Sequence, residues 1–194
     1  MDRRDIWVGK CSSTQSVSCS NGRLITLVSS SGFWYIMNAD MNPASLMSKE
    51  LISPCGMNCA LCSGYLALRH DVKNKGVPIP YCTGCRPRDK QCAFLKKRCH
   101  RLVHTQVEYC FECPEFPCKD LQHLDNRYRA LFHMSMIENL QYIKKHGINK
   151  FLEKEQNQWK CSTCGDVVCC HNGICFHCGI SVLQQKKKRY RWEE

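Results

Sequence analysis

Apolar and polar positions alternate with a helical period in the second half of the chain. One apolar stripe stands before Gly147 and another follows it: Met134, Ile137, Leu140 and Ile143, then Ile148, Phe151 and Leu152. Side chains spaced three and four residues apart share one face of a helix. Because glycine commonly ends a helix, the pattern predicts two helices joined at Gly147 within a helical segment over residues 121–158.

The middle of the chain predicts only short elements. Residues 52–120 hold ten cysteines and six prolines, which interrupt regular structure. Apolar residues recur at helical spacing over residues 61–72 and 94–103, each beginning beside a cysteine. We therefore expect two short helices anchored by cysteine-rich loops in a metal-binding domain over residues 52–120.

The first 48 residues lack a sustained period and are rich in serine. We expect residues 1–48 to be a disordered N-terminal extension that contains Cys11 and Cys19 without ligand-like spacing. The longest early apolar run, Leu24 to Val28, is too short for a secretory signal, and no run approaches the ~20 apolar residues of a membrane span. These patterns predict a cytoplasmic protein with reduced thiols.

Cysteine dominates the candidate chemistry, with eighteen in 194 residues. Ten of them form five pairs with two intervening residues, a spacing that points two sulfurs at one metal ion. In a reducing compartment such an array favours metal binding over disulfides. The cysteines therefore predict bound zinc, about three ions if each set of four thiolates takes one.

The clearest set lies near the C-terminus. Cys161 and Cys164 form one pair, Cys175 and Cys178 a second, and ten residues separate the pairs. A glycine follows each pair, which predicts a positive φ that turns backbone N–H groups towards the sulfurs. The pattern predicts a zinc-ribbon-like β-hairpin over residues 159–182. On its connection lie Cys169, Cys170 and His171, which either replace a ligand, form a second site or are spare loop residues.

Two further sets lie upstream, each with five cysteines for four positions. The first pairs Cys59 and Cys62 with Cys82 and Cys85, nineteen residues on, with Cys55 as the fifth candidate. The second set comprises Cys92, Cys99, Cys110, Cys113 and Cys118. Spacing leaves open which four bind together, whether the two sets interleave, and whether His100 and His104 join them. Four thiolates also suit iron, so an iron–sulfur cluster at the upstream cysteines is the alternative to zinc.

The charge gives a weak indication of partners. The formal net charge is +11, and twelve thiolates holding three divalent ions would reduce it to about +5. Residues 183–194 form a charged tail with five cations, Tyr190 and Trp192, for which we expect a solvated segment or an RNA contact. A protein or nucleic-acid partner stays open, and the sequence predicts no membrane partner.

Three cysteine blocks resemble a known family. They read Ser-Pro-Cys-Gly-Met-Asn-Cys-Ala-Leu-Cys from Ser53, Tyr-Cys-Thr-Gly-Cys-Arg from Tyr81, and Tyr-Cys-Phe-Glu-Cys-Pro-Glu-Phe-Pro-Cys from Tyr109. Residues 52 to about 180 are thereby similar to the cysteine-rich domain of unknown function 3795. The resemblance implies a small cytosolic zinc-binding protein and no defined activity.

These patterns lead to one expected fold and three hypotheses of function. The fold class is a small metal-stabilised α+β protein with cysteine-rich loops, a helical segment and the C-terminal hairpin. The leading hypothesis is a structural-metal binding or adaptor module, and the second is an iron–sulfur redox or sensor protein. A zinc-dependent enzyme is the third, for which Glu112 and Glu115 beside Cys113 are the available acids.

Overall fold

The computed structural model divides the chain into two units, Met1–Ser45 and Leu46–Glu194. The structure describes residues 16–18, 24–30, 33–38, 47–86 and 95–192, and of the first three of these segments it describes the backbone alone.

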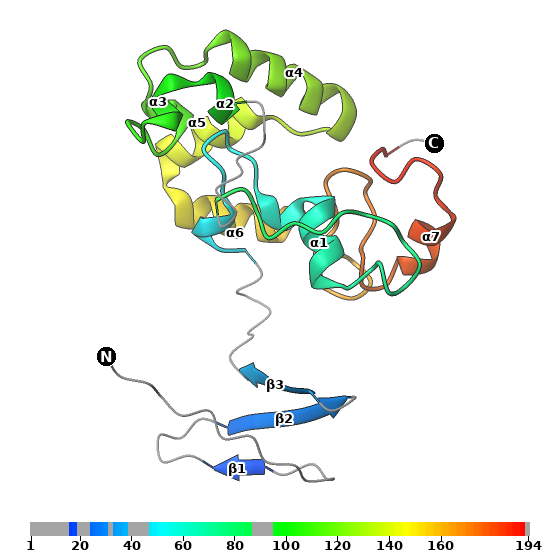
Figure 1. Ribbon diagram of the computed structural model, residues 1–194. Helices are drawn as coiled ribbons and strands as arrows, with labels where there is room; N and C mark the ends of the chain where they lie inside the picture. The colour runs from blue at the N-terminus through cyan, green and yellow to red at the C-terminus, as the bar shows by residue number, and fades with distance from the viewer. Residues whose placement is uncertain (1–15, 19–23, 31–32, 39–46, 87–94, 193–194) are drawn as a thin grey trace. The chain divides into compact units, whose positions relative to one another are not determined.

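The first unit contains a three-stranded antiparallel sheet, with strands in the order β1-β2-β3 (Figure 1). The strands are β1 (Ser16–Ser18), β2 (Leu24–Ser30) and β3 (Phe33–Asn38), and Val28 of β2 pairs with Tyr35 of β3. The early apolar run from Leu24 to Val28 therefore lies in β2. Disorder of residues 1–48 stays a prediction, since Cys11, Cys19 and most of this segment lie outside the described residues.

The second unit begins with short helices around the first cysteine block. They are η2 (Lys49–Leu51), η3 (Cys59–Leu61) and α1 (Ser63–Arg69). The side chain of Asn58 accepts a hydrogen bond from the Ala60 N–H at 3.1 Å and so caps η3. The expected helix over residues 61–72 is thus shorter, because Cys62 in extended conformation separates η3 from α1.

The expected helix over residues 94–103 is divided in the same way. It forms α2 (Leu95–Arg98) and α3 (His100–Val103), and Cys99 between them is extended, with φ −89° and ψ 104°. A further short helix, η4 (Cys110–Glu112), carries the third cysteine block. A cysteine therefore stands at the break between η3 and α1 and at the break between α2 and α3, where its side chain can leave the helical path.

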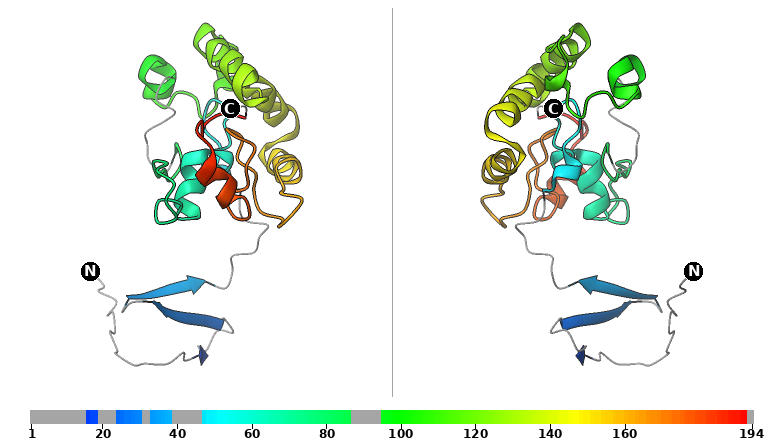
Figure 2. Two further views of the ribbon diagram at one scale, coloured as in Figure 1. Left: turned by 90° about the vertical axis from the view of Figure 1, so that its right-hand side faces the viewer. Right: turned by 90° about the vertical axis from the view of Figure 1, so that its left-hand side faces the viewer.

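Three longer helices confirm the periodicity of the second half. They are α4 (Lys119–Phe132), α5 (Met136–His146) and α6 (Ile148–Gln158). Gly147 joins α5 to α6 with a φ of +81°, as the apolar stripes predicted. Figure 2 shows these helices along one side of the unit, with α1 towards the opposite side and α7 (Ile180–Gln185) between them.

Buried Asp125 fixes the junction of α4 and α5. Its carboxylate accepts hydrogen bonds from the Ser135 hydroxyl at 2.7 Å, the Ile137 N–H at 3.0 Å and Arg129 Nε at 2.7 Å. Burial opposes ionisation of Asp125, but these hydrogen bonds outweigh it and lower the pKa of the carboxyl. Ser135 in turn caps α5 by accepting from the Glu138 N–H at 3.0 Å. The charged network thus sets the angle at which α5 leaves α4.

The expected α+β fold class with a C-terminal β-hairpin is wrong. Within residues 47–86 and 95–192 the second unit has helices and short turns but no β-strand. The segment from Trp159 to Cys178 makes only isolated bridges, Lys160 with Val167 and Val168 with Cys175. Two bridges do not extend into a ladder because turns occupy the residues around each cysteine pair. No zinc-ribbon hairpin is present, and the unit is helical.

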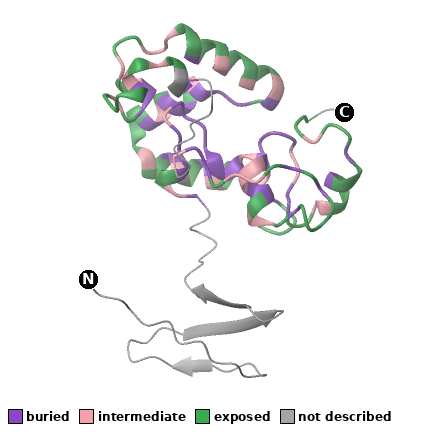
Figure 3. Ribbon diagram, in the orientation of Figure 1, coloured by how far each residue is buried: buried purple, intermediate pink, exposed green. Residues whose placement is uncertain are grey.

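The core runs through the centre of the second unit, where helices and loops face one another (Figure 3). Its largest fully buried side chains are Phe151, Phe176, Ile52, Met57, Leu61, Leu66, Ile79, Leu121, Met136, Leu140, Leu183 and Glu155. Residues from the cysteine loops and from the helices thus share one core. Cys169 and Cys170 are fully buried beside them, so loop geometry and helix packing depend on each other.

Glu155 is the one carboxylate among these largest buried side chains. It is 2 % exposed, and the Asn58 amide donates to its Oε2 at 3.5 Å. Burial raises the pKa of this carboxyl from 4.5 to about 7, against the smaller opposing effects of Lys154 and Asn58. Folded protein therefore holds this proton more tightly than unfolded protein does.

Glu155 is expected to make the folded state less stable as the pH rises from about 4.5 to about 7. Ionisation of the buried carboxyl would cost on the order of 3 kcal/mol by neutral pH. Glu155→Gln should remove this slope, and Glu153→Gln, an exposed site on the same helix, should keep it. Urea unfolding between pH 5 and 8 measures both variants, and parallel curves for wild type and Glu155→Gln would contradict the assignment.

Candidate metal centre

Four cysteines converge in the loops between α6 and α7. The sulfurs of Cys161, Cys164, Cys175 and Cys178 all lie within 4.8 Å of one another. The Sγ atoms of Cys161 and Cys178 are 3.6 Å apart, and those of Cys164 and Cys175 are 3.5 Å apart. Four thiolates around one Zn²⁺ at 2.3 Å would be separated by about 3.8 Å. The group is therefore of the size that holds one metal ion.

Backbone turns position each pair. The Cys161 N–H donates to the Asp166 carbonyl at 2.7 Å, and the Gly165 N–H donates to the Cys161 carbonyl at 2.9 Å. Gly165 has the expected positive φ, +78°. Gly179 has a φ of −102°, so the expectation is wrong there. A side chain at position 179 would be too close to the backbone, because a Cβ there would lie 2.8 Å from the Cys175 carbonyl oxygen.

The four thiols differ in how easily they ionise. Backbone N–H groups of Cys164 and Thr163 lower the pKa of Cys161 to about 6. Hydrogen bonding with Cys164 and then Cys161 raises the pKa of Cys178 to about 12. The low pKa of Cys161 beside the raised pKa of Cys178 shows that ionisation of one thiol disfavours ionisation of its neighbour, and a divalent cation between them would remove this repulsion. The arrangement favours a bound cation.

The two cysteine pairs of the first upstream set, Cys59 with Cys62 and Cys82 with Cys85, lie close together. The Cys85 N–H donates to Cys59 Sγ at 3.3 Å, and the Gly84 N–H donates to Cys82 Sγ at 3.4 Å. Hydrogen bonding with Cys85 and burial raise the pKa of Cys59. Burial is the main cause of the raised pKa of Cys62, with Cys82 and Cys85 as charged neighbours. The folded chain therefore brings the two pairs of this set together.

Cys55 lies near a cysteine of the other upstream set. Burial raises the pKa of Cys110, and the neighbouring charges are those of Cys55, Cys99, Cys118 and Cys113. Cys55 thus neighbours Cys110, although the sequence placed it as the fifth member of the Cys59 set. Cys92, the other candidate of this group, lies outside the described residues.

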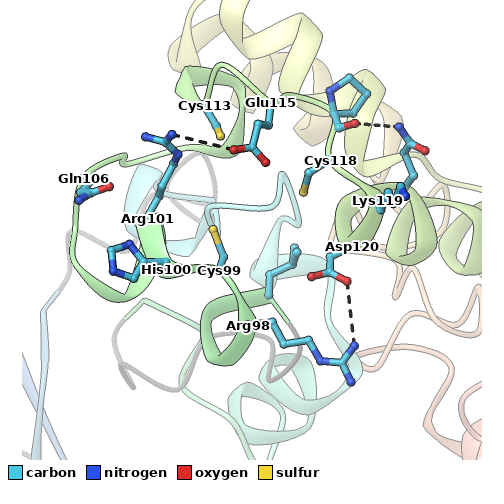
Figure 4. A pocket seen from close by; sticks show the side chains of 13 residues that line it. Arg98, Cys99, His100, Arg101, Gln106, Cys113, Glu115, Cys118, Lys119 and Asp120 are labelled. Atoms are coloured by element: carbon cyan, nitrogen blue, oxygen red, sulfur yellow. Dashed lines mark hydrogen bonds and ion pairs between the residues drawn. The ribbon is translucent and has the colours of Figure 1, made fainter.

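Three of these cysteines open into a pocket of about 760 Å³. Cys99, Cys113 and Cys118 point into it from the break between α2 and α3, the end of η4 and the residue before α4 (Figure 4). Ion pairs of 4.0 Å, Arg98 with Asp120 and Arg101 with Glu115, lie at its rim. His100 also lines this pocket, whereas His104 stacks on His100 with ring centroids 4.2 Å apart.

The spacing in this pocket differs from that at the C-terminal group. Among the described residues, only the Cys161 group brings three or more ligand atoms within 4.8 Å of one another. The upstream thiols are neighbours at wider separation. A single ion would require them to close inwards, while a larger group could use their present spacing.

Cys169, Cys170 and His171 stand outside the four-cysteine group and are buried. Burial lowers the pKa of His171 to about 4, with a smaller effect from Arg127. Its neutral ring accepts a hydrogen bond at Nδ1 from the Ser63 N–H at 3.1 Å and packs edge-on against Phe132. The sequence offered no signal for this role, because the partners lie 108 and 39 residues away.

Fold and site together define a helical, cysteine-rich protein with a four-cysteine cluster that can hold a metal ion. Residues 51–123 match the family described as Protein of unknown function (DUF3795). This match confirms, over residues 51–123, the resemblance drawn from the three cysteine blocks. The match ends before the Cys161 group, and no curated protein or solved structure matches the chain.

The described helices include none that is both long enough and apolar enough to cross a membrane.

Proposed function

We propose that the chain is a zinc-stabilised binding module in which Cys161, Cys164, Cys175 and Cys178 hold a structural zinc ion. The observation that carries the proposal is the approach of all four sulfurs to within 4.8 Å of one another. Thiolate ligands select soft or borderline metals over magnesium and calcium. Four protein ligands leave no open position for water or substrate, so the site stabilises the fold and performs no catalysis.

The metal would hold the loops that join α6 to α7, and this is why we propose a metal-stabilised module. The four cysteines connect α6 to α7, and the loops between them make only two isolated bridges. Such loops gain their conformation from metal coordination, which supplies folding free energy. We propose zinc also for the Cys59, Cys62, Cys82 and Cys85 set, whose close pairs support it.

X-ray absorption at the zinc edge tests this assignment. Purified full-length protein should show zinc surrounded by four sulfurs at about 2.3 Å. Because all sites contribute to one spectrum, the same measurement on Cys178→Ser separates the C-terminal ion from the others. A spectrum dominated by nitrogen or oxygen ligands would overturn the four-cysteine assignment.

An iron–sulfur protein is the second candidate, and the pocket at Cys99, Cys113 and Cys118 favours it. An iron–sulfur cluster distributes its thiolate ligands over several irons. This suits sulfurs that line a pocket but lie too far apart to share one ion. Arg98, Arg101 and Lys119 line the same pocket and would offset the negative charge of thiolates and cluster. With Cys110 beneath, the pocket offers four ligands for such a group.

A pair of variants tests the cluster. If the pocket holds iron, Cys113→Ser should lose most of the iron, acid-labile sulfide and visible absorption of anaerobically purified protein, while zinc at the Cys161 group remains. Cys178→Ser should show the reverse pattern, because its sulfur belongs to the other group. Colourless wild-type protein without iron from anaerobic cells would exclude the cluster.

A further inference from the structure

The charged segment after α7 folds back onto the second unit. The indole N–H of Trp192 donates to the Cys170 carbonyl at 2.7 Å, and the Asn172 side chain donates to the Arg189 carbonyl at 2.7 Å. Lys186 is 9 % exposed, and its ammonium donates to the Trp192 carbonyl at 3.2 Å. Residues 186–192 are therefore held in a defined course against the loop that carries Cys170.

A basic pocket of about 350 Å³ lies between this C-terminal segment and α4. Its lining residues are Pro78, Arg127, Leu131, Phe132, Lys187, Lys188, Arg189, Tyr190 and Arg191. Five of them are cations and none is acidic. Within the described part of the chain, none of the five forms an ion pair with a carboxylate.

One of these cations, Arg189, has a buried N–H group that needs a hydrogen-bond acceptor. The Nε of Arg189 is buried, and among the described residues it has no hydrogen-bond acceptor. A buried guanidinium N–H without an acceptor costs free energy. Arg189 lines the pocket, so an anion bound there would lie beside this guanidinium, and phosphate oxygens match the planar donors of arginine.

We propose that this pocket binds the phosphate backbone of a single-stranded nucleic acid. Four or five cations in a concave site can track successive phosphates. Tyr190 lies in the same lining and is 45 % exposed, so its ring face is free to stack on a base. Such a combination of cations and an accessible aromatic ring is typical of single-strand binding. The inference goes beyond a zinc-stabilised module by assigning it a partner.

Fluorescence anisotropy of a labelled twelve-nucleotide oligo(U) RNA and the matching oligo(dT) tests the pocket. Zinc-loaded full-length protein should bind at 50 mM KCl, and its affinity should fall about 100-fold at 200 mM, as four or five phosphate contacts require. The zinc content of each sample is measured in parallel. Absence of binding with zinc in place would overturn the inference and leave the metal site standing.

Two triple variants separate the pocket from general charge. Changing Lys187, Lys188 and Arg191 to glutamine should weaken binding at least tenfold and flatten the salt slope by about 2. The control changes Lys144, Lys145 and Lys150 of α5 and α6 to glutamine; they are exposed and none lines the pocket. It removes the same charge and should change the affinity by less than about twofold. Equal losses in both variants would overturn the inference.

Tyr190→Ala should weaken binding about tenfold with an unchanged salt slope, because stacking releases no counterions. A Tyr190→Phe variant should retain the affinity, since the ring face persists. Binding to vesicles of phosphatidylserine and phosphatidylcholine, without binding to either oligonucleotide, would show that the pocket takes lipid headgroups. This result would overturn the nucleic-acid partner.

Discussion

Cys178→Ser is expected to cost the protein most of the stability of its C-terminal part and one zinc ion per chain. A structural four-cysteine site contributes on the order of 10 kcal/mol to folding. No backbone ladder supports the cysteine turns, because residues 159–178 form no strand and only two isolated bridges. The side chain of Cys178 is exposed, so the substitution itself removes little packing.

Thermal unfolding followed by tryptophan fluorescence measures this loss, since Trp159 and Trp192 flank the four-cysteine segment and their rings are 6.4 Å apart. Thr163→Ala is the matched control, because this exposed side chain lies in the same turn and is no ligand. It should leave the melting temperature and zinc content nearly unchanged. A chelator should reproduce the effect of Cys178→Ser in the wild type. An equal melting temperature for Cys178→Ser and wild type would contradict a structural metal.

Gly56→Ala is expected to destabilise the second unit by about 2 to 5 kcal/mol. Gly56 has a φ of +86° and carries its backbone against α5, where a Cβ would lie 2.6 Å from the Met136 carbonyl oxygen and 2.9 Å from Leu140 Cγ. The left-handed conformation costs about 1–2 kcal/mol for alanine, and forced overpacking adds about 1–3 kcal/mol. The Asn139 amide also donates to the Gly56 carbonyl at 3.0 Å. This hydrogen bond restrains the Gly56 backbone from moving away from α5.

Gly76→Ala is the control that isolates the packing effect. Gly76 has nearly the same φ, +79°, but a Cβ there would meet nothing within 4 Å. It should therefore lose only the conformational part, about 1–2 kcal/mol. Urea unfolding of both variants gives the two free energies, and equal losses would show that the contact with α5 contributes nothing.

The position of Gly56 links core packing to metal chemistry. It stands between Cys55, which neighbours Cys110, and Cys59, whose sulfur accepts from the Cys85 N–H at 3.3 Å. Displacing the loop from α5 would move both upstream cysteine sets. Gly56→Ala should therefore also reduce the metal content, whereas Gly76→Ala should not.

The sequence predicted the long helices because their signals are local. The apolar stripes of α5 and α6 and the stop at Gly147 need only the nearest neighbours in the chain. The four cysteines of the C-terminal group were recognised for the same reason, since a pair with two intervening residues converges through its own turn.

Features that depend on distant segments were missed or wrong. The C-terminal hairpin was inferred from the two cysteine pairs, but turns around Gly165 and Gly173 occupy the residues that a ladder would need. Spacing left open which cysteines group together, and the neighbourhood of Cys55 and Cys110, 55 residues apart, depends on folding. The basic pocket also depends on Trp192 reaching Cys170, which no periodicity reveals.

Metal content by elemental mass spectrometry tests the central claim most directly. The protein is purified anaerobically without a histidine tag, and its absorption spectrum is recorded on the same sample. We expect about three zinc ions per chain and no colour if all three cysteine sets take zinc, or about two zinc ions with about four irons if the pocket holds a cluster. Folded protein carrying less than one tightly bound metal ion per chain would contradict the account.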